Sequence, residues 1–304
     1  MHVLGKAELT AGFLNFFQNM SAHSIAVLGA QFIRLWKGGC RFVLHVRDKV
    51  FMNDSMPEQT LNDKVILVTG AARRIGAAIV TRLHENGARV AVHYRGSKDE
   101  AECFANRLNS DRDSSAAAFQ ADLLNIGSLS ALINDVVAWG GRLDGLVNNA
   151  SSFYPTPVGS IDEEQWDELI GSNLKAPLFL SQAAAPHLQD SGGAIVNIVD
   201  IHAERPLRDH SVYGSAKAGL AMLTRSLAKD LAPAVRVNGV APGAILWPEN
   251  GMTDTVQKSI LDQIPLNRAG DPGDIAGCVL YLLKDASYVT GQIISVDGGR
   301  SIGW

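Results

Sequence analysis

A tyrosine and a lysine four residues apart form the most informative pair in the chain. Tyr213 and Lys217 stand in the segment Tyr-Gly-Ser-Ala-Lys, and a helix there would place both side chains on one face, about one turn apart. A neighbouring ammonium favours the phenolate, so the pair predicts a tyrosine pKa below the usual value of about 10 and a proton donor that works near neutral pH. Upstream, Asp200 ends an apolar, β-branched run and would face the pair from a strand end. The segment predicts a small acid–base group.

Strands and helices alternate along the rest of residues 61–304, which is typical of a parallel sheet with crossover helices. The expected strands are 65–69, 89–93, 116–119, 143–147, 194–199, 235–240 and 293–296. The expected helices are a stretch that follows the turn at 70–76 and runs to about 86, then 101–108, 126–138, a long region that Asp162 caps, 212–231, and 272–283 after the cap Asp271. Residues 244–265 are expected to form an irregular loop over the substrate. We therefore predict a single α/β domain with a Rossmann-like, doubly wound parallel sheet and helices on both faces.

Residues 1–60 show no such pattern and are predicted to be an N-terminal extension. They are interpreted either as a poorly ordered segment or as a misassigned start, with Met52 or Met56 as the natural first residue. A signal peptide is disfavoured because Glu8 and a short, broken apolar stretch do not suit one. The predicted catalytic domain is residues 61–304.

Composition excludes several functional classes. The 304 residues are 46% hydrophobic and 19% charged with a net charge of −4, which gives no indication of a nucleic-acid partner. No apolar run approaches the roughly 18 residues that span a bilayer, so no membrane association is expected. The three cysteines lie far apart and the eight histidines form no ligand motif, so we expect no metal and a reducing, cytoplasmic location.

A glycine turn after the first strand predicts a site for phosphate groups. Gly70 and Gly76 bracket a turn that leads from a β-branched run into a helix, and backbone N–H groups at a helix start bind anions. By itself this pattern also fits an ordinary tight turn. The next strand ends in His93-Tyr-Arg-Gly-Ser97, without the acid that binds the 2′-hydroxyl of NAD. A cation and a hydroxyl suit a 2′-phosphate, so NADPH is expected rather than NADH, unless Arg95 is simply a solvated charge.

Taken together, these segments resemble the short-chain dehydrogenase/reductase family over nearly all of residues 61–304. The resemblance is carried by Thr-Gly-Ala-Ala-Arg-Arg-Ile-Gly at 69–76, Asn-Asn-Ala at 148–150, Asn173, and Tyr213-x-x-x-Lys217. It implies that Tyr213 is the general acid, that Lys217 holds the nicotinamide ribose and that Asn173 supports a water relay. The cofactor contacts that it implies are Gly70, Arg73, Arg74, Ile75, Gly76, His93, Tyr94, Arg95, Ser97, Asp122, Leu123, Asn149, Ala150, Ser151, Tyr213, Lys217, Pro242 and Gly243.

Two departures from the general family pattern narrow the expected substrate. Asp200 stands where most carbonyl-reducing members have a serine that donates to the substrate carbonyl, and Arg74 stands where a second glycine is common. With the run Ser-Ser-Phe-Tyr-Pro at 151–155, they resemble the pteridine reductase branch of the family. That resemblance implies that Phe153 stacks on a pterin. The substrate contacts expected are Arg74, Ser151, Phe153, Asp200, Tyr213 and Trp247.

The sequence thus predicts an NADPH-dependent pteridine reductase that acts on dihydropterins, with oxidised pterins and dihydrofolate as further candidates. One alternative is a carbonyl-reducing member of the family, such as a 3-oxoacyl reductase. The other is a non-catalytic member that senses NADP, although the intact Asn173, Tyr213 and Lys217 speak against it. Family members are commonly tetramers, so a homotetramer is the expected assembly.

Overall fold

The structure is a computed structural model that describes residues 36–37, 40–41, 60–245 and 253–302. The chain divides into two units, Met1–Pro57 and Glu58–Trp304. In the first unit, the described residues form two short antiparallel strands, β1 (Trp36–Lys37) and β2 (Cys40–Arg41). The remaining expectations for residues 1–60 lie outside the described residues, apart from Thr60. Among the described helices, none has the length and apolar character needed to cross a bilayer.

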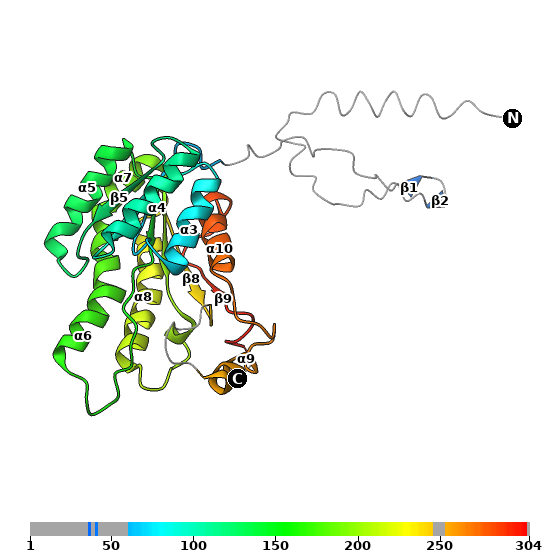
Figure 1. The fold of residues 1–304 in the computed structure, drawn as a ribbon. Coiled ribbons are helices and arrows are strands. Elements are labelled where there is room, and N and C mark those ends of the chain that lie inside the picture. The colour runs from blue at the N-terminus through cyan, green and yellow to red at the C-terminus, as the bar shows by residue number, and fades with distance from the viewer. Residues whose placement is uncertain (1–35, 38–39, 42–59, 246–252, 303–304) are drawn as a thin grey trace, which may run out of the picture. The chain divides into compact units, whose positions relative to one another are not determined.

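The second unit contains one parallel sheet of seven strands in the order β5-β4-β3-β6-β7-β8-β9, which confirms the predicted fold class (Figure 1). From β3 the chain builds outward to β5, then returns to place β6 on the other side of β3 and continues to β9. In such sheets ligands bind beyond the carboxyl ends of the strands where the direction of building reverses. The strands are β3 (Val65–Val68), β4 (Arg89–Tyr94), β5 (Ala116–Gln120), β6 (Gly145–Asn148), β7 (Ala194–Ile198), β8 (Arg236–Pro242) and β9 (Ile293–Val296).

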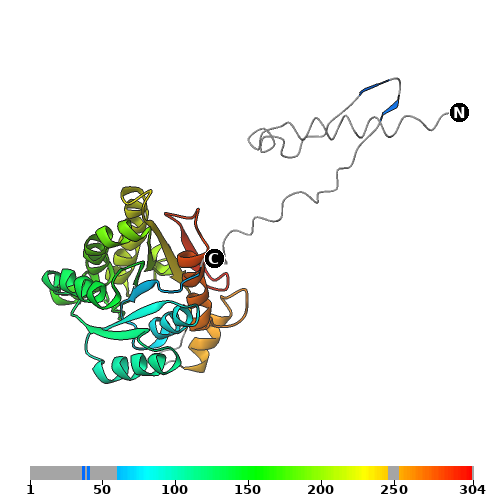
Figure 2. The ribbon, with the colours of Figure 1, turned by 90° about the horizontal axis from the view of Figure 1, so that it is seen from above.

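Alternating side chains of the buried strands face two separate hydrophobic cores. Ile66 and Val68 pack in one core, whereas Val65 and Leu67 pack in the other, as the two-residue period of a strand requires. The first core is completed by α3 (Arg74–Glu85), α4 (Lys98–Asp111) and α10 (Pro272–Lys284). The second is completed by α5 (Leu129–Gly140), α7 (Ala176–Ser191) and α8 (Ser211–Asp230). Figure 2 shows these helices packed around the sheet.

Capping residues fix the starts of two helices near the ligand-binding edge, as the sequence predicts. Asp162 and Gln165 form a capping box at the start of α6 (Glu163–Ile170), and Asp271 with Asp274 does the same for α10. Helix α6 continues through a π-helical turn, Gly171–Lys175, directly into α7. Isolated π turns are rare and are often found at functional sites.

Several predicted boundaries are wrong, and the largest error concerns residues 244–265. This segment contains a helix, α9 (Asp254–Leu261), whose first turn is capped by the side chain of Thr253. Nearby proline and glycine residues hid this short amphipathic pattern in the sequence. In addition, α4 begins three residues earlier than predicted, and residues 126–128 form a 3₁₀ turn before α5.

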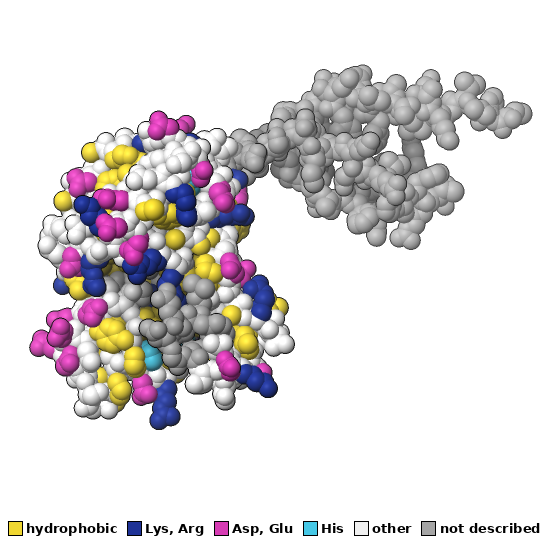
Figure 3. Space-filling view, in the orientation of Figure 1, with side chains coloured by type: hydrophobic (Ala, Val, Ile, Leu, Met, Phe, Trp, Pro, Cys, Tyr) yellow, Lys and Arg dark blue, Asp and Glu magenta, His cyan; other side chains and the backbone are white. Residues whose placement is uncertain are grey.

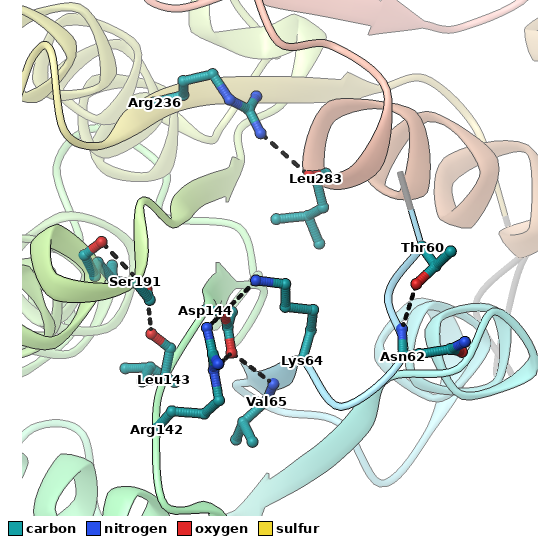
Figure 4. Close-up of polar contacts among 11 residues, drawn as sticks. Thr60, Asn62, Lys64, Val65, Arg142, Leu143, Asp144, Ser191, Arg236 and Leu283 are labelled. Carbon is teal, nitrogen blue, oxygen red and sulfur yellow. Dashed lines mark hydrogen bonds and ion pairs between the residues drawn. The ribbon is translucent and has the colours of Figure 1, made fainter. Parts of the chain in front are cut away.

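A carboxylate holds the amino-terminal edge of the sheet together, opposite the ligand-binding edge (Figure 4). Asp144, just before β6, accepts hydrogen bonds from Arg142, from Lys64 Nζ at 3.0 Å and from the backbone N–H of Val65 at 3.0 Å. Although burial alone would raise the pKa of Asp144, the hydrogen bonds from Arg142, Val65 and Lys64 hold that pKa below its usual value. The carboxylate thereby links β3 to β6.

We expect Asp144→Asn to destabilise the domain by about 1 to 2 kcal/mol, because it removes the charge from the acceptor of these hydrogen bonds while solvent still screens the partly exposed cations Lys64 and Arg142. Urea unfolding at pH 7 measures this loss, with Asp135→Asn on the exposed side of α5 as the control. Since the pKa of Asp144 is depressed, its contribution is present above about pH 4 and is lost as the pH falls further. An unfolding free energy equal to that of the control would contradict this role.

Acidic and basic side chains are interspersed on the face of the molecule in Figure 3. This distribution agrees with the nearly balanced totals of 27 Lys and Arg against 31 Asp and Glu.

Candidate active site

A cavity of about 400 Å³ opens at the carboxyl ends of β3, β4 and β6, where the direction of sheet building reverses. Its walls come from the glycine turn, from the strand end at 93–95, from the segment after β5 and from the loop after β6. The lining residues are Gly70, Arg73, Arg74, Ile75, Gly76, His93, Arg95, Asp122, Leu123, Leu124, Asn149, Ala150, Ser151, Ser152 and Ser172. Many of the predicted cofactor contacts therefore share one cavity.

The glycine turn is packed too closely for larger residues. A Cβ atom at Gly70 would lie 2.9 Å from Cα of Ala150, and one at Gly76 would lie 2.7 Å from Nδ2 of Asn149. Asn149 also donates to the backbone oxygens of Thr69 at 2.8 Å and Gly70 at 3.0 Å. The turn is thus attached to the end of β6, which leaves the start of α3 open to the cavity.

Arg74 has a left-handed backbone, with φ of 53°, at the position where the family pattern often has glycine. Glycine adopts this conformation without strain, whereas arginine does not. The exposed guanidinium of Arg74 occupies the cavity side of the turn. The departure from glycine therefore keeps the backbone conformation and adds a cation.

His93 lines the cavity, although both nitrogens of its ring have partners within the protein. Nδ1 accepts from the backbone N–H of Gly70 at 3.1 Å, and Nε2 lies 3.1 Å from the carbonyl oxygen of Ala121. This arrangement fixes a neutral ring with the proton on Nε2. Burial lowers the pKa of His93 to about 4. The neutral ring of His93 therefore accepts a hydrogen bond from the glycine turn and carries no positive charge for a phosphate.

Tyr94 and Ser97 are also predicted to contact the 2′-phosphate, but neither lines the cavity. Tyr94 is 8% exposed and packs in the hydrophobic core, which removes its side chain from the cofactor. Ser97 precedes α4 and does not line the cavity. Arg95 and Arg73 are exposed on the cavity wall, and Arg73 forms an ion pair with Glu100. Two arginines of the predicted cofactor contacts, Arg73 and Arg95, therefore line the cavity.

The structure brings Asp200 and Tyr213 into direct contact. The hydroxyl of Tyr213 donates to Oδ2 of Asp200 at 2.7 Å, and Oδ1 of Asp200 accepts from the backbone N–H of His202 at 2.8 Å. Lys217 is buried, donates from Nζ to the carbonyl oxygen of Ile198 at 2.8 Å and lies 5.7 Å from the centroid of the Tyr213 ring. The three ionisable groups thus form one cluster between β7 and α8.

This contact reverses the predicted shift of the tyrosine pKa. Burial and the carboxylate of Asp200 raise the pKa of Tyr213 well above its usual value, and hydrogen bonding to Ser151 opposes them only in part. Burial also lowers the pKa of Lys217 to about 8, although Asp200 acts in the opposite direction. The prediction of a phenol acidified by Lys217 is therefore wrong. Tyr213 keeps its proton.

Asn173 lies in the π-helical turn and organises the loop after β6. Its Oδ1 accepts from the hydroxyl of Ser151 at 2.6 Å, and its Nδ2 donates to the carbonyl oxygens of Ser152 at 2.9 Å and Leu169 at 3.0 Å. In the described structure the side chain is 1% exposed. Asn173 thus holds Ser151, which in turn reaches Tyr213.

Phe153 projects from the same loop, and its ring is 55% exposed. The ring lies edge-on to Tyr213, with centroids 4.8 Å apart, and stacks on His210 at 4.7 Å. An exposed aromatic ring beside a proton donor is suited to bind a flat ligand.

Of the remaining predicted site residues, some line the cavity and others lie outside its lining. Leu123 is buried in the cavity wall, and exposed Asp122 accepts from the backbone N–H of Leu124. Pro242 ends β8, and Gly243 packs so close to Asp297 that a Cβ atom would lie 2.7 Å from its Cα. Trp247 lies outside the described residues.

Sequence reasoning missed two residues that contact the site, His210 and Glu168. His210 precedes Tyr213 by three residues, a spacing that would have placed it on the same side of a helix. Glu168 precedes Asn173 by five residues and gave no comparable indication.

The chain matches a family model described as enoyl-(acyl carrier protein) reductase over residues 70–301. It is 38% identical to pteridine reductase 1 of Leishmania tarentolae, with 78% of this chain and 96% of that protein covered. It is also 38% identical to the 3-oxoacyl-[acyl-carrier-protein] reductase FabG of Staphylococcus epidermidis, with coverage of 78% and 98%. A blue fluorescent protein from a metagenomic library, solved in complex with NADPH, superposes with a TM-score of 0.75 at 35% identity, covering 80% of this chain and 99% of that one.

These matches, the seven-stranded parallel sheet and the Tyr213–Lys217 cluster agree with one another. The chain belongs to the short-chain dehydrogenase/reductase family of oxidoreductases. Two relatives of equal identity carry different reactions in their names, so identity alone does not select a substrate for this chain.

Proposed function

We propose that the protein is an NADPH-dependent pteridine reductase that converts dihydropterins, and in some cases oxidised pterins or dihydrofolate, to tetrahydro forms. The observation that carries the proposal is the 2.7 Å hydrogen bond from Tyr213 to Asp200. A carboxylate accepts hydrogen bonds and repels a developing alkoxide, whereas it suits a nitrogen heterocycle that carries N–H groups. The similarity to pteridine reductase 1 supports this choice.

The residues of the cavity fit an anionic dinucleotide. The glycine turn exposes the start of α3, and Arg73, Arg74 and Arg95 add positive charge along the wall. No acid stands at the end of β4, where NAD sites place one for the 2′-hydroxyl. These features favour NADPH over NADH, as does the similarity to a protein solved with NADPH.

The acid–base cluster supports proton delivery to a ring nitrogen. NADPH, when bound, supplies the hydride that adds to the carbon of a C=N bond, and the nitrogen must then take a proton. Because the pKa of Tyr213 is raised, its hydroxyl holds that proton until the nitrogen acquires charge. Asp200 is half-buried, so it is placed to pass a proton from solvent back to the phenolate. Each C=N bond reduced takes one hydride and one solvent proton, so a dihydropterin needs one round and an oxidised pterin needs two.

Phe153 and Ser151 complete the proposed substrate site. The exposed ring of Phe153 offers an aromatic surface next to Tyr213, which suits the flat pterin bicycle. Ser151 lines the cofactor cavity and approaches Tyr213, so it lies between the two ligands. Arg74 lines the same cavity and would contact both ligands.

A 3-oxoacyl reductase is the second candidate, because a FabG protein is equally similar. Asp200 speaks against it, since the position would need a donor for the substrate carbonyl. A non-catalytic NADP sensor is disfavoured by the retained Asn173, Tyr213 and Lys217.

Initial rates of NADPH oxidation with dihydrobiopterin, dihydromonapterin, dihydrofolate and an acetoacetyl thioester test the proposal under identical conditions. We expect turnover with at least one pterin. Oxidation with the thioester alone would establish the 3-oxoacyl alternative, and NADPH binding without any turnover would establish the sensor.

The cofactor preference has its own test in Arg95→Gln. Removing this cation should lower the preference for NADPH over NADH about tenfold, or 1.4 kcal/mol, because only NADPH carries the 2′-phosphate. Ratios of kcat/KM for the two cofactors measure the change, with Arg107→Gln on the exposed side of α4 as the control. A wild-type preference for NADH by more than about tenfold would contradict the assignment of NADPH.

We further propose a cytoplasmic homotetramer, as the family resemblance implies. Trp166, Leu178 and Met222 are exposed apolar side chains on α6, α7 and α8 that such an assembly would cover.

A further inference from the structure

The loop after β6 carries Phe153 without any regular secondary structure of its own. Residues 151–155 form neither helix nor strand, and the ring of Phe153 is 55% exposed. Packing on His210 and Tyr213 covers only part of this ring. Its position therefore depends on what holds the residues on either side.

Glu168 contacts both of those neighbours. Its Oε1 accepts from the hydroxyl of Ser152 at 2.9 Å, and its Oε2 accepts from the hydroxyl of Tyr154 at 3.0 Å. All three side chains are half-buried. One carboxylate thus bridges the two residues that flank Phe153, so the loop cannot twist without breaking a hydrogen bond to a charged group.

The helix that supplies Glu168 is itself well anchored. Helix α6 starts at the Asp162 capping box, and the residue after Glu168, Leu169, is completely buried against Val212 and Tyr213. The ring of Tyr154 packs on this same cluster. Glu168 therefore connects the Phe153 loop to the packing that also fixes Tyr213.

We propose that Glu168 is a positioning residue that sets the orientation of the Phe153 ring through Ser152 and Tyr154. The proposal rests on the proposed function in one respect, namely that Phe153 contacts the substrate. Glu168 does not line the cofactor cavity, and its role is exerted through these two neighbours.

The variants Glu168→Ala and Glu168→Gln distinguish whether Glu168 acts through its hydrogen bonds or through its negative charge. Glu168→Ala removes both contacts, whereas Glu168→Gln keeps one acceptor and offers an amide N–H to the other hydroxyl. We expect Glu168→Ala to raise the KM for a dihydropterin about tenfold and Glu168→Gln to raise it less than threefold. In both variants kcat should stay within threefold of wild type, and the NADPH Kd should rise less than the pterin KM, although Ser152 also lines the cofactor cavity. Glu163→Ala, on the exposed first turn of α6, is the control.

Two further variants test the route through the neighbours. Ser152→Ala and Tyr154→Phe should each raise the pterin KM, and neither should raise it further when Glu168 is already alanine, because they act through one contact set. The proposal would be overturned if Glu168→Ala had the same pterin KM as wild type. It would also be overturned if the effects of Ser152→Ala or Tyr154→Phe added to that of Glu168→Ala, or if the NADPH Kd rose as much as the pterin KM.

Hydrogen exchange gives a readout that needs no substrate. The backbone N–H groups of residues 151–156, of which Pro155 has none, should exchange faster in Glu168→Ala than in wild type, while those of β6 remain unchanged. If the wild-type protein reduced no pterin, the proposed function would fail, and faster exchange confined to 151–156 would still support the role of Glu168. Unchanged exchange in that segment would overturn it.

Discussion

Asp200→Ser is expected to reduce kcat/KM for dihydropterins by at least 100-fold, roughly 3 kcal/mol of transition-state stabilisation. The carboxylate accepts a hydrogen bond from the hydroxyl of Tyr213 at 2.7 Å and is the proposed route by which a proton returns from solvent. Serine is too short to keep that contact and has no comparable basicity. A serine hydroxyl does donate to a carbonyl, so turnover of an acetoacetyl thioester should be retained or increased.

Two control variants show whether the change in substrate preference comes from the carboxylate of Asp200. Asp200→Asn keeps the shape of the side chain and removes its charge, so a similar loss of pterin turnover would assign the effect to the carboxylate. Asp135→Ser, on the exposed side of α5, should leave both reactions unchanged. Full pterin turnover in Asp200→Ser would contradict the substrate assignment.

Tyr213→Phe is expected to lower kcat about 1000-fold, within the range for loss of a general acid. The ring lies in a cluster with Leu169 and Val212, which phenylalanine can fill, so the fold should be retained. Lys217 keeps its own hydrogen bond to Ile198, and NADPH binding should therefore change little. Single-turnover rates together with NADPH titration separate the chemical step from binding.

The double variant Tyr213→Phe/Asp200→Asn tests whether the two groups act as one unit. If the proton passes between them, the second change should add little to the loss of the first. Losses that multiply would contradict a shared proton path, and a Tyr213→Phe enzyme with a normal kcat would exclude Tyr213 as the acid.

The sequence was sufficient to predict the architecture, because its β-branched runs alternate with helical segments over the whole domain. Local patterns such as the Asp162 and Asp271 caps also appear in the structure as predicted. These features depend on neighbours within a few residues, which a sequence displays directly.

Features that depend on distant contacts were not predictable in the same way. The four-residue spacing correctly put Tyr213 and Lys217 on one helix, but it could not show that Lys217 donates to Ile198 while Asp200 accepts a hydrogen bond from the phenol. Those contacts arise when β7 and α8 meet in the fold. They reverse the shift of the tyrosine pKa.

The carboxyl end of β4 is a second place where contacts with distant residues decide the role of each side chain. His93 and Tyr94 stand next to Arg95 in the sequence, yet His93 turns inward to the glycine turn and Tyr94 enters the core. Strand alternation places neighbours on opposite sides, but which polar atom finds an internal partner depends on the packing of β3 and β5. Only Arg95 of the three remains exposed.

A competition assay tests the central claim most directly. Dihydrobiopterin and an acetoacetyl thioester are supplied together at equal concentration with limiting NADPH, and both products are quantified, so that their ratio gives the ratio of kcat/KM. We predict that tetrahydrobiopterin is the main product for the wild-type protein and that Asp200→Ser shifts the ratio toward the hydroxyacyl thioester. A wild-type reaction that yields mainly the hydroxyacyl thioester would contradict the account.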